Sequence, residues 1–195
     1  MTDSSRQSDR ELIAGIRSGD TQALQRLLTT YWDALVQYAG RVLGGGDPQD
    51  VVQEAFIRLW AQRERWTDEG SVRSLLYTIT RNTALDERRR HARGERVALA
   101  ADPPGPPAEP SADVEAAQLR AAASKAVAAL PPKRREVFRL AREEGLTYAE
   151  IAAVMGLSPQ TVANHMSLAL SDLRSALAPH LDASSAAAET PPPAS

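Results

Sequence analysis

The sequence TYAEIAAVMGLSPQTVANH, residues 147–165, decides how the C-terminal part of the chain folds. Thr147 with Glu150 three residues later is the pattern of a capping box, which marks a helix start, and Gly156 is suited to end that short helix. Ser158 followed by Pro159 is an N-cap and first-turn pair that opens another helix. The spacing of these signals predicts a helix-turn-helix.

The second helix of this motif separates an apolar face from a hydrogen-bonding face. Apolar residues recur at helical spacing and predict a buried stripe, formed by Val162, Met166, Ala169, Leu170 and Leu173. The opposite face has short polar side chains that suit base edges and phosphates in a major groove. The candidate contacts are Ser158, Gln160, Thr161, Asn164 and His165, with Lys133 and Arg134 as phosphate clamps. The alternative is an ordinary helical hairpin whose outer face is only solvated.

The charge of the chain is segregated, although its total is small. The 195 residues contain 23 Lys and Arg and 25 Asp and Glu, and a net charge of -2 alone argues against a uniformly basic nucleic-acid binder. However, residues 73–96 have a net charge of +4 and residues 116–181 of +3, whereas residues 97–115 have -4. The two basic segments are therefore the candidates for nucleic-acid contact.

Proline marks the division of the chain into two parts. Five of the 13 prolines lie between Pro103 and Pro110, in an acidic segment without aromatic residues that has too little apolar surface to fold alone. We therefore expect an all-α protein of two small helical domains joined by a Pro-rich linker. The expected parts are a flexible N-terminus (1–8), a four-helix domain (9–96), the linker (97–115), a helix-turn-helix domain (116–180) and a disordered tail (181–195).

The third helix of the N-terminal domain is expected from Pro48, after an N-cap at Asp47, to about residue 65. Its apolar residues cover one arc and predict a core face, made of Val51, Val52, Ala55, Phe56, Leu59 and Trp60. The opposite face has Ile57 among polar residues, namely Asp50, Gln53 and Glu54. That face is either solvated or a docking surface for a basic partner, and periodicity leaves both interpretations open.

The fourth helix is basic and is expected from a cap at Ser71 to about His91. Its core face is expected to contain Val72, Leu75, Leu76, Ile79 and Thr83. The other side combines guanidinium groups, an aromatic ring and small residues, which allow a sugar-phosphate backbone to approach and a base to stack. The candidate contacts are Arg73, Tyr77, Thr80, Arg81, Asn82 and Arg88. A solvated helix end is the alternative, and Asn82 could instead form a buried pair with Asp86.

Two sets of motifs together resemble one protein family. The sequences DPQDVVQEAFIRLW (47–60) and LYTITRNTALD (76–86) look like region 2 of extracytoplasmic-function (group 4) RNA polymerase sigma factors of the sigma-70 family. The sequences LPPKRREVF (130–138), YAEIA (148–152) and GLSPQTV (156–162) look like region 4 of the same family. The resemblance covers about residues 9–178. The sequence departs from the family pattern at Leu75, where relatives often have Trp, and at Ala163, where relatives often have a basic residue.

The resemblance implies a transcription initiation factor that binds core RNA polymerase and directs it to promoters. The third helix would dock on polymerase through Asp50, Gln53, Glu54 and Ile57. The fourth helix and the loop at residues 66–71 would recognise and melt the -10 element, and the last helix would read the -35 element. The resemblance also implies an anti-sigma factor as a partner. A cytoplasmic location without direct membrane insertion is expected from the residues themselves, because the chain has no cysteine and residues 1–10 are polar, with no apolar export segment.

Two other classes of protein fit the sequence less well. A LuxR-type regulator has a similar helix-turn-helix, but such proteins usually contain a receiver or ligand domain that the N-terminal half does not resemble. Enzymatic activity is not expected, because neither Lys125 nor Lys133 lies in a Gly-Lys-Ser/Thr phosphate loop. No metal or cofactor is expected either, since the chain has no cysteine and only three histidines.

Overall fold

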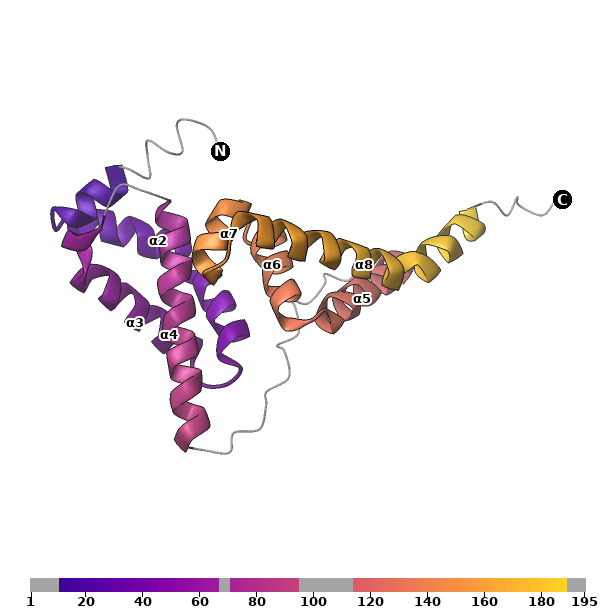
Figure 1. Cartoon of the computed structure of the whole chain (residues 1–195), viewed down its shortest axis with the longest axis horizontal. Helices are drawn as coiled ribbons and strands as arrows, with labels where there is room; N and C mark the ends of the chain where they lie inside the picture. Colours follow the sequence, from indigo (N-terminus) through magenta and orange to yellow (C-terminus); the bar gives the residue numbers. More distant parts are fainter. Residues whose placement is uncertain (1–10, 67–70, 95–113, 189–195) are drawn as a thin grey trace. The chain divides into compact units, whose positions relative to one another are not determined.

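The structure is a computed structural model that describes residues 11–66, 71–94 and 114–188, and every regular element in these ranges is a helix (Figure 1). A helix over residues 11–17 precedes α2 (Thr21–Leu43), α3 (Pro48–Ala61), the short 3-10 helix η1 (Arg63–Arg65) and α4 (Val72–Gly94). Then follow α5 (Val114–Ala129), α6 (Pro132–Arg142), α7 (Tyr148–Met155) and α8 (Pro159–Ala188). The expected all-α class is confirmed. The N-terminus at 1–8 and the linker up to residue 113 lie outside the described residues.

Contacts between the helices define two compact units. The first contains α2, α3, η1, α4 and α7, and the second contains α5, α6 and α8. The short helix α7 was expected in the C-terminal domain, but it belongs to the first unit, where it packs on α4.

The core of the first unit lies between α2, α3 and α4. Leu27 and Leu35 of α2 and Leu59 of α3 are fully buried. Two aromatic pairs join the helices: the Trp32 and Phe56 rings have centroids 6.4 Å apart, and Tyr38 and Tyr77 have centroids 5.1 Å apart. Aromatic pairs at such separations add to the stabilisation from burial alone.

The helix α3 begins as the sequence predicts and ends earlier. Asp47 accepts a hydrogen bond from the Gln49 amide at 2.8 Å, and Pro48 occupies the first turn. The expected core face is buried, except that Trp60 is half-buried. The helix ends at Ala61 because Gln62 leaves the helical conformation (φ -102°, ψ 7°), and the chain tightens into η1. The expectation of one helix to residue 65 was wrong.

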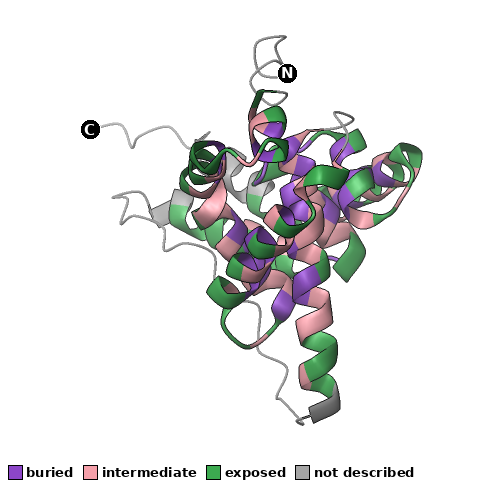
Figure 2. Cartoon of the chain, turned by 90° about the vertical axis from the view of Figure 1, so that its left-hand side faces the viewer, coloured by how far each residue is buried: buried purple, intermediate pink, exposed green. Residues whose placement is uncertain are grey.

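The buried face of α4 differs from the expected one. It contains Val72, Leu76, Tyr77, Thr80, Thr83 and Ala84. Leu75 and Ile79, which were expected in the core, are only half-buried. The methyl group of threonine and the ring of tyrosine supply apolar surface that hydropathy scales undervalue. The predicted core face of α4 was therefore displaced towards Leu75 and Ile79. Over residues 85–92 of α4, all residues are exposed or half-buried, as the colours of Figure 2 show.

A glycine loop after α2 contacts the far end of α4. Gly44, Gly45 and Gly46 all have positive φ, and the first of them ends α2 in the left-handed conformation. Arg88 of α4 donates from Nη1 to the carbonyl of Val42 at 3.0 Å. A Cβ on Gly46 would lie 3.1 Å from Cε1 of His91. The loop and the end of α4 therefore pack closely.

The second unit is built around α8. Its core contains Ala126 and Leu130 at the end of α5 and Ala169 and Leu173 of α8, with Val127, Phe138 and Leu177 packed against them. The helix α8 was expected to end near Leu177, but it continues through Pro179 to Ala188. The tail expected from residue 181 is therefore helical as far as Ala188, and residues 189–195 lie outside the described residues.

Candidate functional site

One face of α3 exposes an apolar side chain among polar ones. Ile57 is 55% exposed, and Asp50 and Gln53 are also exposed. Glu54 is half-buried, and its Oε1 accepts a hydrogen bond from Arg58 Nε at 2.7 Å. The four residues predicted for docking therefore share one helix face, but the carboxylate of Glu54 is already paired.

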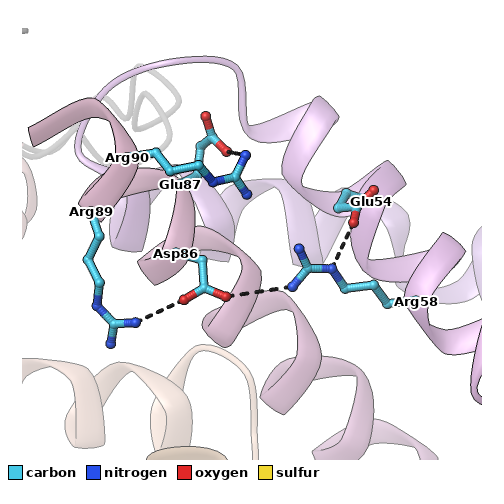
Figure 3. Close-up of polar contacts among 6 residues, drawn as sticks. All are labelled: Glu54, Arg58, Asp86, Glu87, Arg89 and Arg90. Atoms are coloured by element: carbon cyan, nitrogen blue, oxygen red, sulfur yellow. Dashed lines mark hydrogen bonds and ion pairs between the residues drawn. The ribbon is translucent and has the colours of Figure 1, made fainter. Parts of the chain in front are cut away.

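A chain of ion pairs links this face of α3 to α4 (Figure 3). Besides Glu54, Arg58 contacts Asp86, with Nη1 and Oδ2 3.7 Å apart. Asp86 in turn accepts from Arg89 Nη1 at 2.9 Å. Glu87 and Arg90 of α4 form a separate pair at 2.8 Å. These side chains are partly exposed, so each pair contributes at most about 1 kcal/mol. The pairs orient the side chains more than they stabilise the fold.

The candidate DNA contacts of α4 fall into two groups. Asn82 and Arg88 are exposed, and Arg73 and Arg81 are half-buried. Tyr77 is 1% exposed and Thr80 is 0% exposed, so their expected position on an open face was wrong. Both side chains lie on the buried arc with Leu76. Of the further basic residues, Arg89 and Arg90 are exposed, and the loop at residues 67–70 lies outside the described residues.

The carboxylate of Glu150 has two structural roles in the first unit. It completes the capping box of α7, where Oε2 accepts from the backbone N and the Oγ1 of Thr147, both at 2.8 Å. Its Oε1 accepts from Oγ of Ser71, just before α4. Burial by itself raises the pKa of Glu150, but the hydrogen bonds from Ser71 and Thr147, with the charge of Arg73, outweigh it and lower the pKa below 4.5.

The turn between α7 and α8 has the geometry that the sequence predicts. Gly156 ends α7 with φ 66° and ψ 40°, in the left-handed conformation, and α8 begins at Pro159. The amide of Leu157 donates to the carbonyl of Ala152 at 2.9 Å and so satisfies one of the last carbonyls of α7. The two helices are thus separated by three residues.

The N-terminal part of α8 presents polar side chains. Gln160, Asn164 and the preceding Ser158 are exposed, whereas Thr161 and His165 are half-buried. The side-chain amide of Gln160 donates to Asn164 Oδ1 at 3.2 Å. Val162 and Met166, on the other face, are buried as expected. The arrangement offers hydrogen-bonding groups on a helix N-terminus, which is the chemistry that phosphates and base edges require.

The basic residues before this motif differ in their pairing. Lys133 is exposed at the start of α6. Arg134 is half-buried and forms an ion pair with Asp172 of α8, with Nη1 and Oδ2 2.7 Å apart. Sequence reasoning missed this pair, along with Arg58–Asp86 and Ser71–Glu150, because each joins residues of different helices or of a helix and a loop. The pattern within one helix predicts only contacts such as Glu54–Arg58, which are four residues apart.

Within the described ranges, no three histidine or acidic side chains gather in a way that could hold a metal ion. None of the helices in those ranges has both the length and the apolar character needed to cross a bilayer. The candidate site consists of two separate polar surfaces, on α3 with α4 and on α6 with α8.

Comparison with known proteins matches both halves of the chain. Residues 27–94 match Sigma-70 region 2, and residues 120–173 match Sigma-70, region 4. The ECF RNA polymerase sigma factor SigL of Mycobacterium tuberculosis is 31% identical over 165 residues, which cover 83% of this chain and 93% of SigL. The probable RNA polymerase sigma factor RfaY of Xanthomonas campestris is 32% identical over 85% of this chain, which spans only 43% of RfaY.

A solved structure has a similar fold. CnrH, in complex with the cytosolic domain of CnrY, superposes with a TM-score of 0.61 at 28% identity and covers 87% of this chain and 96% of CnrH.

Proposed function

This chain belongs to the extracytoplasmic-function sigma factors of the sigma-70 family, which direct RNA polymerase to specific promoters, and we propose that its two matched regions divide this task. Region 2 binds core RNA polymerase through α3 and recognises and melts the -10 element through α4. Region 4 reads the -35 element through α8. The chain binds and positions the promoter, and bond formation belongs to the polymerase.

The exposure of Ile57 is the observation that carries the polymerase-binding proposal. An apolar side chain 55% exposed on a well-packed helix, with Asp50 and Gln53 around it, has the composition of a small protein interface. Glu54 contributes to this surface mainly by fixing Arg58. We therefore assign the main docking energy to Ile57 and Gln53.

The proposed DNA contacts are those candidates that reach solvent. In region 2 they are Arg73, Arg81, Asn82 and Arg88, and the arginines that follow extend the basic surface. In region 4 they are Ser158, Gln160 and Asn164, with Thr161 and His165 at the edge of the face and Lys133 and Arg134 as phosphate contacts. Short polar groups on a helix N-terminus support base reading. The arginines, of which Arg88 is exposed and Arg73, Arg81 and Arg134 are half-buried, support contact with the DNA backbone.

We assign the chain to group 4 of the family, because the segment between the two matched regions, residues 95–119, is too short for a further domain. We also propose that it acts in the cytoplasm, where core polymerase and DNA are found. An anti-sigma factor that covers these surfaces is the expected negative regulator, and the binding of a cytosolic domain to CnrH supports this assignment.

Transcription in vitro tests the proposal directly. Core polymerase mixed with the purified chain should initiate at specific sites on genomic fragments, and the Ile57→Asp variant should lose both initiation and binding to core. Leu119→Asp is the matched control, because Leu119 is also exposed (38%) but lies on α5. Initiation by the Ile57→Asp variant at the wild-type level would contradict the assignment of this face of α3 to polymerase binding. If the wild-type chain neither binds core polymerase nor supports initiation, the proposed function is wrong.

A further inference from the structure

One large apolar side chain of α8 is exposed on the same face as the proposed base contacts. Leu168 is 46% exposed, whereas Met166 and Leu173 are buried. It lies one helical turn after Asn164 and two turns after Gln160, and these two are joined by a hydrogen bond. Residues four apart lie next to each other on a helix surface, so the three side chains form a row.

The surroundings of Leu168 indicate what it contacts. Ser167, Ser171 and Ser175 are exposed near it on this face, Asp172 four residues further on is paired with Arg134, and Arg174 is the one Lys or Arg between Pro159 and His180. Protein interfaces depend on clusters of large anchoring side chains, which a single leucine among serines and a paired aspartate does not provide. In the major groove, by contrast, the one apolar group that a base pair presents is the C5-methyl group of thymine.

We propose that Leu168 contacts the C5-methyl group of a thymine in the -35 element and is therefore a specificity-determining residue of region 4. The inference rests on the proposed function, because it requires α8 to lie in the major groove. Leu168 is about 6 Å further along the helix axis than Asn164, which corresponds to about two base-pair steps. Asn164 and Gln160 then hydrogen-bond to neighbouring base edges while Leu168 adds an apolar contact.

The experiment replaces thymine with uracil, which pairs in the same way but lacks the methyl group. A promoter obtained from the transcription assay is prepared with deoxyuridine at each thymine of its -35 element in turn, on either strand. Binding of the holoenzyme to these duplexes is then measured. Replacement of the one thymine that Leu168 contacts should lower the affinity of the wild-type holoenzyme about four-fold. This loss corresponds to about 0.8 kcal/mol, the value for one buried methyl-sized group.

Variants assign this effect to Leu168. The Leu168→Ala holoenzyme should bind thymine and uracil duplexes equally well, and Leu168→Met should retain the preference for thymine. Leu119→Ala, which removes an exposed leucine of α5, should behave as the wild type. A Leu168→Ala holoenzyme that still discriminates the two bases overturns the inference and leaves a protein partner as the occupant of this face. A -35 element without an A·T pair, or no uracil effect in the wild type, also overturns it.

Two further variants separate this inference from the function on which it rests. Asn164→Ala and Gln160→Ala should each change the preferred -35 sequence. If they do so and Leu168→Ala does not, only the methyl contact is wrong. If none of the three changes the preference, α8 is not the reading helix, and the proposed function of region 4 is wrong with it.

Discussion

Arg134 of α6 and Asp172 of α8 form an ion pair in which Nη1 and Oδ2 lie 2.7 Å apart. The side chains are 30% and 42% exposed, so a DNA phosphate could reach the guanidinium group. Because Asp172 neutralises Arg134, a phosphate must compete with this carboxylate for the same positive charge. The pair therefore reduces the contribution that Arg134 can make to DNA binding.

Replacement of Asp172 should strengthen DNA binding. We expect the Asp172→Asn holoenzyme to bind promoter duplex about two- to five-fold more tightly, which matches the worth of a partly exposed ion pair. Since one more phosphate contact becomes available, the plot of log affinity against log salt should also steepen by about one. A salt titration measures both effects. The gain should disappear in the Arg134→Ala background, and its persistence there would exclude competition for Arg134.

Thr80 provides a test of the corrected face of α4. Its side chain is fully buried, and Oγ1 has no hydrogen-bond partner among the described residues. Thr80→Val replaces an unpaired hydroxyl with a methyl group of similar shape, so the free energy of unfolding should rise by about 1 kcal/mol. Urea denaturation measures the change, and promoter recognition should be unaffected.

Thr78→Val is the matched control for this variant. Thr78 Oγ1 donates to the Ser74 carbonyl at 2.7 Å, so its removal should not stabilise the protein. Loss of -10 recognition in the stably folded Thr80→Val variant would return Thr80 to the DNA-contacting residues.

The pKa of Glu150 predicts how stability depends on pH. Its folded-state pKa lies below 4.5 because the hydrogen bonds from Ser71 and Thr147, together with the charge of Arg73, outweigh the effect of burial. A lowered pKa stabilises the fold above the unfolded-state value, and this stabilisation is lost as the pH falls through the folded-state value. Glu150→Gln should therefore lower the free energy of unfolding near neutral pH by about 1.5–3 kcal/mol and flatten its fall in acid.

Denaturation at pH values above and below 4.5 measures this difference. Glu64→Gln is a suitable control, because the side chain of Glu64 is 80% exposed and should contribute little. Equal acid sensitivity of Glu150→Gln and the wild type would show that the hydrogen bonds to Ser71 and Thr147 do not depend on the charge.

Arg88 should combine a structural role with its proposed role in DNA binding. Its hydrogen bond to Val42 satisfies a carbonyl near the end of α2. Arg88→Ala should thus lower the free energy of unfolding by about 1 kcal/mol in addition to weakening promoter binding. Arg88→Lys keeps the positive charge and so separates the two roles, when the free energy of unfolding and the salt dependence of promoter binding are both measured. Promoter binding that falls without any change in stability would contradict the structural role.

The two central helices of region 2 differ in how well the sequence predicts their buried faces. In α3, the pairs Val51–Val52 and Ala55–Phe56 fill one arc with apolar residues, so helical periodicity alone identifies the core face. In α4, Thr80 and Tyr77 are buried although both are polar, and Leu75 remains half-buried. Hydropathy ranks these residues in the wrong order, because the methyl group of threonine and the ring of tyrosine pack as apolar surface.

The surfaces proposed for binding were predictable only in part. Ile57, Asn164 and Gln160 are exposed as helical spacing suggests, because each lies opposite a continuous apolar stripe. The ionic partners of Arg58 and Arg134 were not predictable, since Asp86 and Asp172 lie on other helices. Such contacts depend on how the helices pack against each other, and the spacing of residues within one helix does not predict which residues of another helix will be near.

The glycine loop between α2 and α3 has a consequence for the handedness of the residues that it accepts. At Gly44, φ is +69° and a Cβ would meet nothing within 4 Å, so an L-residue is disfavoured only by the left-handed backbone conformation, at a cost of about 1–2 kcal/mol. A chemically synthesised chain with D-alanine at this position should fold normally and lose less entropy on folding than the natural one. At Gly46, an L-side chain would also approach His91, so backbone conformation and space both disfavour it. Among the natural residues glycine fits these positions with the least backbone strain, and the tight approach of α2 to the basic end of α4 thus depends on a run of three glycines with positive φ.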